Sequence, residues 1–518
     1  MWNETFSVIF KHREKLIFLV KEYGDKGVYI LLDMHQDVLW QAGSNEDQGY
    51  WGVPKWIKNK LEMPKRLFPW PFTQIAAWEC GYLTEEVSRG FGQFYSNVNG
   101  VADSFAKFWG FLAEEFKDYE SVLGYELINE PFAGDLYQAF SVLLPGQAGS
   151  LNLAPLYEKT AAEIRKVDSE TLIFYEPVTW GYFAPLPQNP IIDEVLVDSM
   201  NTFNLWSLEK VINAVCGPLE MMNLTDFSYT YLSGIANVSV LGPGFAQVPG
   251  GPDYNNRSVM SWHYYCEVFD SASDSGTSSS ILVQFFCDIL FGPDVFNTVK
   301  VRTEEIGGGS MLTEFGLCYP NITDTEDKNT IECSRVMDLS DRYFQSWTYW
   351  DSSWLWNSDD GSAKQNALGV FSRPYPISTA GQPQNLTFNY RSRYFYYEFF
   401  LNTKIVEPTE IFVPSILYPN HKFDLELSSL LTWEFSPHNP DILFVTLQQT
   451  KKEEEEVNLT KESKDNTKVA QKSPEDNKEV SKTLMAKPKI IEDTKSTGET
   501  QNTNKEDPKP STDPKSDD

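Results

Sequence analysis

Short apolar runs that end in a polar or aromatic residue recur along the chain up to residue 350, and segments with helical spacing separate several of them. The runs that we expect to be strands cover residues 28–33, 122–130, 171–176, 259–264, 310–314 and 346–350. The helical segments cover residues 4–23, 101–119 and 156–167. Alternation of strands and helices predicts a parallel sheet. Because polar residues at the ends of many such strands are typical of a closed barrel, the expected fold is a (β/α)8 TIM barrel of the α/β class.

A closed barrel of this type has eight strands, and this pattern supplies six. The helix over residues 4–23 is followed directly by the run that we assign as the third strand, so the first two strands are expected upstream of Met1. We expect that a longer parent chain carries them, together with a signal peptide. A barrel without two of its strands has unpaired sheet edges on both sides of the gap, which favour misfolding or aggregation.

The pattern changes after residue 350. We expect the barrel domain to cover residues 1–384 and a β-sandwich to cover 385–449, with short strands at 388–395, 410–413 and 442–447. Residues 450–518 are rich in Lys, Glu, Asp, Ser, Thr and Pro and contain no aromatic residue. Such a segment cannot bury enough apolar surface to offset its ordering entropy, so we expect this tail to be disordered.

Composition narrows the class of protein. The net charge of −30 at pH 7 argues against nucleic acid as a partner and against a polybasic membrane contact. Six cysteines permit up to three disulfides, and Asn-x-Ser/Thr occurs seven times. Together these signals favour an extracellular or lysosomal location, although no signal peptide opens the chain and no apolar run is long enough to span a bilayer. An aromatic content of 14% slightly favours a sugar-binding cleft, since flat rings stack on pyranose rings.

Two glutamates occupy corresponding places in the pattern. Glu130 follows the apolar residues 125–128 and precedes Pro131, and Glu314 ends the run 310–314. Cleavage of a glycosidic bond with retention requires at least two carboxyl groups, and two acids at the mouth of a barrel meet this requirement. Glu130 is the candidate acid, which must carry its proton when substrate binds. Glu314 is the candidate nucleophile, which must stay ionised. The alternative is that each is an ordinary acid at a strand end.

Other polar and aromatic residues end the same strands. His35 and His263 are expected to hydrogen-bond sugar hydroxyls or to orient a carboxylate, although a lone histidine is more often a structural residue. Tyr265 lies on the same face as His263, where its hydroxyl is expected to donate to the nucleophile. Asn129 is expected to bind the hydroxyl next to the anomeric carbon. Trp350 is expected to form the floor of the sugar site, or alternatively to pack in the core.

The long loop after the first expected strand carries two further aromatic candidates, Trp56 and Trp78, which are expected to wall the same cleft. Metal binding by the two histidines is not expected, because the reaction needs no ion and the sequence shows no ligand spacing.

Taken together, these motifs resemble glycoside hydrolase family five, and within it the endoglycoceramidases. The resemblance covers roughly residues 1–449. It rests on Leu-Leu-Asp-Met-His-Gln-Asp at 31–37, Asn-Glu-Pro-Phe at 129–132, Thr-Glu-Phe-Gly at 313–316, Arg-Pro-Tyr-Pro at 373–376 with Ala-Gly at 380–381, and Phe-Val-Pro-Ser-Ile-Leu-Tyr-Pro at 412–419. The family's first two strands, which carry a basic residue near the catalytic acids, have no counterpart in this sequence.

The resemblance implies hydrolysis of the β-linkage between an oligosaccharide and ceramide, with Glu130 as acid/base and Glu314 as nucleophile. It implies that no metal or cofactor is needed, that the partner is a glycosphingolipid met at a membrane or micelle surface, and that no obligate protein partner takes part. The implied sugar contacts or supports are Asp33, His35, Trp78, Asn129, His263, Tyr265 and Trp350. The aromatic segments 68–72 and 203–206 are candidates for the lipid-side walls, with core packing as the alternative.

Two further hypotheses stay open. One is a β-glucosidase that acts on glucosylceramide or a steryl glucoside and processes only the monoglycosylated lipid. The other is a catalytically inactive glycolipid-binding remnant, which binds saturably without turnover.

Overall fold

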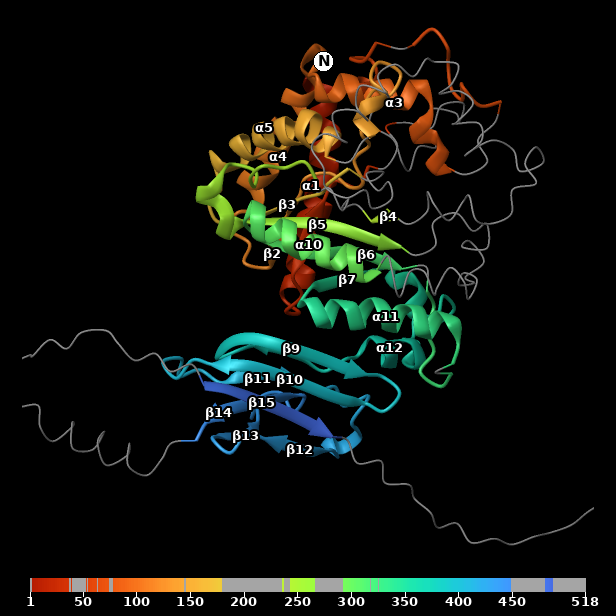
Figure 1. Cartoon of the computed structure of the whole chain (residues 1–518). Coiled ribbons are helices and arrows are strands. Elements are labelled where there is room, and N and C mark those ends of the chain that lie inside the picture. The colour runs from red at the N-terminus through yellow and green to blue at the C-terminus, as the bar shows by residue number, and fades with distance from the viewer. Residues whose placement is uncertain are drawn as a thin grey trace, which may run out of the picture.

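The computed structural model describes residues 2–36, 39, 53, 55–62, 64–73, 78–143, 146–178, 235–236, 243–265, 292–316, 318–324, 326–448 and 480–487. Figure 1 shows two parts, a parallel sheet with its helices and a smaller pair of antiparallel sheets. Among the described residues, no helix is both long enough and apolar enough to cross a membrane.

Six parallel strands form the larger sheet in the order β1-β2-β3-β5-β6-β7. Their bounds are β1 Ile30–Asp33, β2 Val122–Glu126, β3 Leu172–Tyr175, β5 Ser258–Tyr265, β6 Gly309–Gly316 and β7 Ser346–Trp350. The short strand β4 (Ile235–Ala236) pairs antiparallel with β5. In the described part of the chain, β1 and β7 end the hydrogen-bonded order and do not pair with each other. The six predicted strands, and a barrel left open between β1 and β7, are therefore confirmed.

One helix precedes the first strand, and the others lie between or after the strands of the sheet. They are α1 Trp2–Gly24, α2 Lys55–Lys58, α3 Glu85–Tyr95, α4 Val101–Phe116, α5 Ala154–Arg165, α10 Gly292–Ile306, α11 Lys328–Tyr343 and α12 Gln365–Phe371, with short 3-10 or π turns between them, including η1 Trp78–Leu83 and η4 Gly149–Leu153. Two of them start at side-chain caps: Thr84 accepts from the Val87 N–H before α3, and Asp327 accepts from the Thr330 N–H before α11. All three predicted helices are present, with ends shifted by a few residues.

The barrel core consists of large aromatic and aliphatic side chains between the sheet and its helices. Trp109 of α4 is 1% exposed, and its Nε1 donates to the Leu127 carbonyl at 3.0 Å. Trp262 of β5 is fully buried and packs edge-on against Phe296 of α10. Trp109 therefore binds a helix directly to the segment that leads from β2 to Glu130.

The smaller part is a sandwich of two four-stranded antiparallel sheets, ordered β12-β15-β10-β9 and β13-β14-β11-β8. The strands are β8 Tyr375–Ser378, β9 Gly381–Asn389, β10 Tyr394–Leu401, β11 Thr409–Phe412, β12 Asp424–Leu427, β13 Leu431–Phe435, β14 Ile442–Leu447 and β15 Val480–Lys487. Alternating residues of these strands, among them Tyr397, Phe399, Ile411 and Leu443, form one buried core.

Three expectations for this region are corrected. The sandwich starts with β8 and β9, before residue 385, because β8 pairs with β11. The expected strand at 388–395 is two strands, since residues 390–393 form a turn in which Arg393 has φ 55°. The tail is not disordered throughout, because β15 pairs with both β10 and β12. Main-chain hydrogen bonds to two neighbouring strands order this segment without aromatic residues. Residues 449–479 and 488–518 lie outside the described residues.

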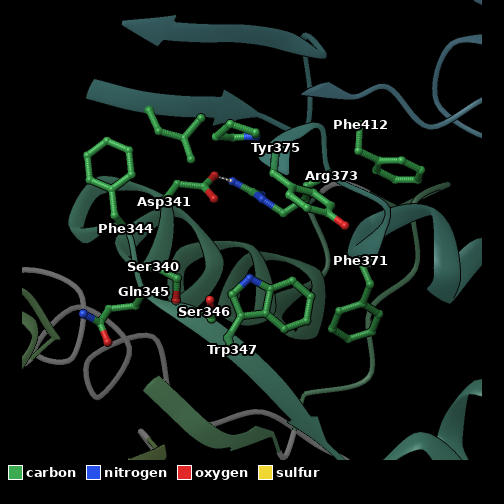
Figure 2. A pocket seen from close by; sticks show the side chains of 12 residues that line it. Ser340, Asp341, Phe344, Gln345, Ser346, Trp347, Phe371, Arg373, Tyr375 and Phe412 are labelled. Atoms are coloured by element: carbon green, nitrogen blue, oxygen red, sulfur yellow. Dashed lines mark hydrogen bonds and ion pairs between the residues drawn. The ribbon is translucent and has the colours of Figure 1, made fainter. Parts of the chain in front are cut away.

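The two parts meet at Arg373, which is 3% exposed. Its Nη2 donates to Asp341 at 2.5 Å and to Asp338 at 2.6 Å, both on α11, and its guanidinium lies 4.7 Å from the ring centroid of Phe388 in β9. Figure 2 shows Arg373 and Asp341 beside a cavity of about 390 Å³, which Trp347 of β7 and Phe412 of β11 also line. The arginine of the predicted Arg-Pro-Tyr-Pro motif thus holds barrel and sandwich together.

One disulfide lies in the described part of the chain. Cys318, just after β6, is bonded to Cys333 of α11, with a Cα–Cα distance of 5.7 Å. The bond is consistent with the expected use of cysteines in disulfides. Of Cys80 only the backbone is described, and the other three cysteines lie outside the described residues.

Candidate active site

The two predicted acids lie together at the carboxyl end of the sheet. Glu314 belongs to β6, and Glu130 follows β2 in a left-handed backbone conformation with φ 39°. Both are largely buried, at 8% and 9% exposed. One carboxylate oxygen of each, together with a ring nitrogen of His263, forms a cluster whose atoms lie within 4.8 Å of one another.

His263 lies between the two acids. It is the register partner of Glu314 across the β5–β6 pair. Its Nδ1 is 2.8 Å from Glu314 Oε2 and 3.0 Å from Glu130 Oε1, and the residue is 1% exposed. The predicted contact of this histidine with a catalytic carboxylate is therefore present, and it reaches both acids at once.

The charges of the cluster set its protonation. Burial acts to raise the pKa of Glu314, but the positive charge of His263 and hydrogen bonds from His263 and Tyr265 hold that pKa below its ordinary value. Burial acts to lower the pKa of His263, but the surrounding carboxylates, Glu176 and Glu314 first among them, raise it well above its ordinary value. Glu314 is thus held as a carboxylate beside an imidazolium, which is the state that a nucleophile requires.

Two further acids, not predicted from the sequence, lie beside this pair. Glu126 of β2 and Glu176, directly after β3, are 4% and 0% exposed. Burial and the charge of Asp33 raise the pKa of Glu126 to about 7, and burial raises the pKa of Glu176 well above its ordinary value. A sequence signal for Glu176 existed, since it follows an apolar strand and precedes Pro177, as Glu130 precedes Pro131.

The remaining strand-end residues surround the acids. Asp33 Oδ2 is 2.8 Å from His35 Nδ1 at the end of β1. The His35 ring stacks on Trp350 at the end of β7, with ring centroids 4.8 Å apart and planes 4° from parallel. Trp350 remains 42% exposed. The stack joins the two strands that flank the open side of the barrel, and one face of Trp350 is covered by His35.

Asn129 and Tyr265 complete the group. Asn129 is 3% exposed, and its N–H donates to the Met34 carbonyl at 2.9 Å. Tyr265 is also buried, and the hydrogen bond to Glu314 that its position predicted is present. The structure therefore gathers eight of the ten predicted residues at one end of the sheet: Asp33, His35, Asn129, Glu130, His263, Glu314, Tyr265 and Trp350.

The aromatic candidates of the long loop are less informative. Trp78 opens η1, but its side chain lies outside the described residues, as does the segment 203–206. Trp56 is 39% exposed and packs near Lys60, whose Nζ lies 5.7 Å from the ring centroid. In the segment 68–72, Phe72 is buried in the barrel core, as the packing alternative predicted.

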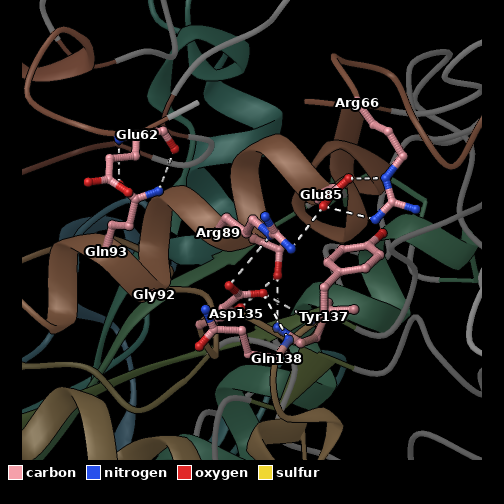
Figure 3. A network of polar contacts seen from close by, with 12 residues as sticks. Glu62, Arg66, Glu85, Arg89, Gly92, Gln93, Asp135, Tyr137 and Gln138 are labelled. Atoms are coloured by element: carbon pink, nitrogen blue, oxygen red, sulfur yellow. Dashed lines mark hydrogen bonds and ion pairs between the residues drawn. The ribbon is translucent and has the colours of Figure 1, made fainter. Parts of the chain in front are cut away.

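The segment after Glu130 is held from several sides. The carbonyls of Phe132, Ala133 and Gly134 accept hydrogen bonds from side chains on α3 and η4, at distances from 2.5 to 2.7 Å; the donors are Tyr95, Asn152 and Ser88. Figure 3 shows Arg89 of α3 between Glu85, at 3.1 Å, and Asp135, at 3.7 Å. Asp135 in turn accepts from two N–H groups of the same segment. These contacts fix the loop that carries the candidate acid.

The same acids bear on metal binding. Glu126, Glu176 and His263 form a second set with ligand atoms within 4.8 Å of one another, so both such sets share His263. A protonated imidazole has no lone pair for a cation, so a metal ion would bind at either set only with His263 neutral.

Comparison with known protein families decides the class. The cellulase model of glycosyl hydrolase family 5 matches residues 4–354, and the family 5 C-terminal domain model matches residues 373–460. The chain belongs to glycosyl hydrolase family 5. Membership of family 5 makes it a glycoside hydrolase with the two-part architecture described above.

Two relatives of this chain have the same name. The chain is 30% identical over 370 residues to an endoglycoceramidase of Cyanea nozakii, covering 67% of this chain and 54% of that protein. It is 29% identical over 451 residues to an endoglycoceramidase of Hydra vulgaris, covering 81% and 67%. The chain thus spans about half the length of the Cyanea relative. Endo-glycoceramidase II from Rhodococcus sp., solved as a ganglioside GM3 complex, shares the fold with a TM-score of 0.57 at 19% identity, covering 93% of this chain and 85% of that one.

Proposed function

We propose that this protein is a retaining endo-β-glycosidase that hydrolyses the linkage between the oligosaccharide and ceramide of glycosphingolipids. The observation that carries the proposal is the spacing of Glu130 and Glu314. One carboxylate oxygen of Glu130 lies within 4.8 Å of one carboxylate oxygen of Glu314. Retaining glycosidases hold their two carboxyl groups about 5–5.5 Å apart, whereas inverting enzymes leave about 6.5–9.5 Å for a water molecule. The names of the Cyanea and Hydra relatives support the choice of substrate.

The reaction proceeds in two displacements. In the first, a carboxylate oxygen of Glu314 attacks the anomeric carbon, the bond to the ceramide oxygen breaks, and that oxygen takes the proton of Glu130. In the second, Glu130 takes a proton from water, whose oxygen attacks the anomeric carbon and releases Glu314. The His263 imidazolium stabilises the negative charge of Glu314 before attack. Asp33, His35, Asn129 and the free face of Trp350 line the sugar side.

The cellular setting belongs to the same proposal. The Cys318–Cys333 disulfide supports an oxidising compartment, and with the glycosylation sequons it favours an extracellular or lysosomal glycoprotein that breaks down glycosphingolipids. The substrate is then met at a membrane or micelle surface.

The test is release of lactose from fluorescent lactosyl-ceramide by the wild type, Glu130→Gln and Glu314→Gln, with Glu120→Gln as a matched exposed control. We expect release by the wild type and the control and loss in both site variants, each folded by circular dichroism. A folded wild type that releases nothing from lactosyl- or glucosyl-ceramide contradicts the proposal. If that protein binds the lipids saturably, the binding-protein hypothesis is favoured. If the wild type instead cleaves glucosyl-ceramide but not lactosyl-ceramide, the β-glucosidase hypothesis is favoured.

A further inference from the structure

Glu176 is a buried acid whose side chain reaches the main chain of the candidate acid/base. It directly follows β3 and is fully buried. Its Oε2 accepts the N–H of Glu130 at 2.6 Å, and its own carbonyl accepts the Tyr157 hydroxyl of α5 at 2.6 Å. Glu176 therefore links a helix, the strand β3 and the backbone of Glu130.

This hydrogen bond matters because of the backbone conformation of Glu130. A φ of 39° lies in the left-handed region, which a non-glycine residue adopts only where its surroundings hold it there. The carbonyl of Glu130 is contacted by the Tyr82 hydroxyl at 3.5 Å, which is a long hydrogen bond. The short contact to Glu176 is thus the stronger hold on this residue. In this conformation Glu130 Oε1 reaches His263.

The other oxygen of Glu176 faces the same cluster. Its Oε1 lies 3.6 Å from His263 Nδ1, which is beyond hydrogen-bond distance, while Glu130 and Glu314 hold closer positions on that nitrogen. Glu176 can therefore act through the backbone of Glu130, and this role needs no contact between Glu176 and the sugar.

We propose that Glu176 is a positioning residue for the acid/base. Its carboxyl oxygen holds the main chain of Glu130 in the left-handed conformation that aims the Glu130 carboxyl at the glycosidic oxygen. The inference rests on the proposed function and assigns to Glu176 a part of it that the two catalytic acids alone do not explain.

The proposal predicts a dependence on the leaving group. Departure of the ceramide oxygen needs the proton of Glu130, whereas fluoride departs as an anion and needs none. Misplacing Glu130 should therefore slow cleavage of lactosyl-ceramide but leave attack by Glu314 on an activated fluoride unchanged. Damage to the whole site would slow both reactions alike.

The experiment compares the wild type, Glu176→Met and Glu176→Gln. Methionine keeps the volume of the side chain but removes the oxygen acceptor, and glutamine keeps an oxygen acceptor in place. Two readouts are taken: kcat/KM on lactosyl-ceramide, and the rate at which 2-deoxy-2-fluoro-lactosyl fluoride labels the peptide containing Glu314, followed by mass spectrometry.

We expect Glu176→Met to lose about 100-fold in kcat/KM on lactosyl-ceramide, within the range of general acid catalysis, while its labelling rate stays within about 3-fold of the wild type. Glu176→Gln should recover most of the lost kcat/KM. The assignment is overturned if the methionine variant loses equally in both readouts or loses in neither. It is also overturned if the glutamine variant changes the ratio of the two readouts by more than about 10-fold, and this test stands even if the methionine variant does not fold. A folded wild type that is not labelled overturns the proposed function itself.

Discussion

Two buried clusters in this molecule have the same make-up, one cation among several carboxylates, yet they differ in the cation. At the junction of barrel and sandwich, the guanidinium of Arg373 lies between Asp338 and Asp341. At the carboxyl end of the sheet, the imidazole of His263 lies between Glu130 and Glu314. Arginine stays protonated at any pH that a protein tolerates, whereas histidine exchanges its proton near neutrality.

The difference separates a structural cluster from a reactive one. Around Arg373 the cation keeps its proton, and both carboxyls accept from its Nη2. Burial raises the pKa of Asp341 to about 6, but the cation that both aspartates contact does not exchange its proton near neutrality. Four carboxyls surround the single imidazole of His263, and this environment moves the pKa of Glu314 down and that of Glu176 up. Pairs of acids whose pKa values are driven apart are typical of catalytic sites.

Removing the cation from the reactive cluster should have the largest effect. We expect His263→Asn to lower kcat/KM on lactosyl-ceramide by at least about 10³-fold, because Glu314 loses the charge that holds it ionised and Glu130 loses a hydrogen bond. The acidic limb of the pH–rate profile should move to higher pH, since the pKa of Glu314 rises. The measurement is kcat/KM against pH, with His438→Asn on the sandwich as control. An unchanged acidic limb contradicts this account.

Removing the cation at the junction of barrel and sandwich should lower the stability of the fold instead of the activity. We expect Arg373→Met to lower the free energy of unfolding by about 3–5 kcal/mol, the usual cost of leaving buried charges without their partner. Arg391→Met, at a more exposed arginine that pairs with Glu326, is the matched control and should cost less than about 1 kcal/mol. Denaturant unfolding measures both. Intact stability in the Arg373 variant, or loss of kcat in its folded fraction, would remove the contrast between the clusters.

The sequence predicted the parts of the site that depend on strand ends. Glu130 and Glu314 follow apolar runs, and the carboxyl ends of parallel strands meet at one edge of a sheet, so their proximity was predictable. The position of His263 between them depends on a register shift between Trp262 and His263 in the β5–β6 pair, which no local pattern encodes. Glu176 carries the same strand-end signal as Glu130, but two acids are enough for the chemistry, so the pattern alone does not predict a role for it.

Long-range pairing explains the other misses. The segment that forms β15 has a charged, weakly apolar composition, so only its two neighbouring strands make it a strand. The sequence pattern predicts the start of the sandwich too late, because β8 is only four residues long and pairs with β11 across the β9–β10 hairpin. The composition of a segment does not show which strands it pairs with, and that pairing decides whether its residues form a strand.

The excess of acids in the reactive cluster predicts that stability depends on pH. The pKa of Glu126 is raised from 4.5 to about 7, so the folded state keeps a proton that the unfolded chain releases. Stability from this group is complete below about 4.5 and is lost as the pH rises through about 7, by roughly 3 kcal/mol. Glu126→Gln should flatten the fall in unfolding free energy between pH 4.5 and 7, and Glu120→Gln should not. Parallel curves for the wild type and Glu126→Gln exclude this source.

Removing the Tyr265 hydroxyl should have the smallest effect, and it separates the effect of hydrogen bonding on Glu314 from the effect of charge. Tyr265 donates a hydrogen bond that lowers the pKa of Glu314, as His263 does, but it carries no charge. We expect Tyr265→Phe to lower kcat/KM about 10-fold, near the lower bound for a hydrogen bond to a charged group, and to move the acidic limb upward by less than His263→Asn does. Tyr343→Phe, which removes a hydroxyl contacting the Pro293 carbonyl away from the site, is the control. If the tyrosine variant shifts the limb as far as the histidine variant, hydrogen bonding rather than charge holds Glu314 ionised, and the identity of the cation no longer distinguishes the two clusters.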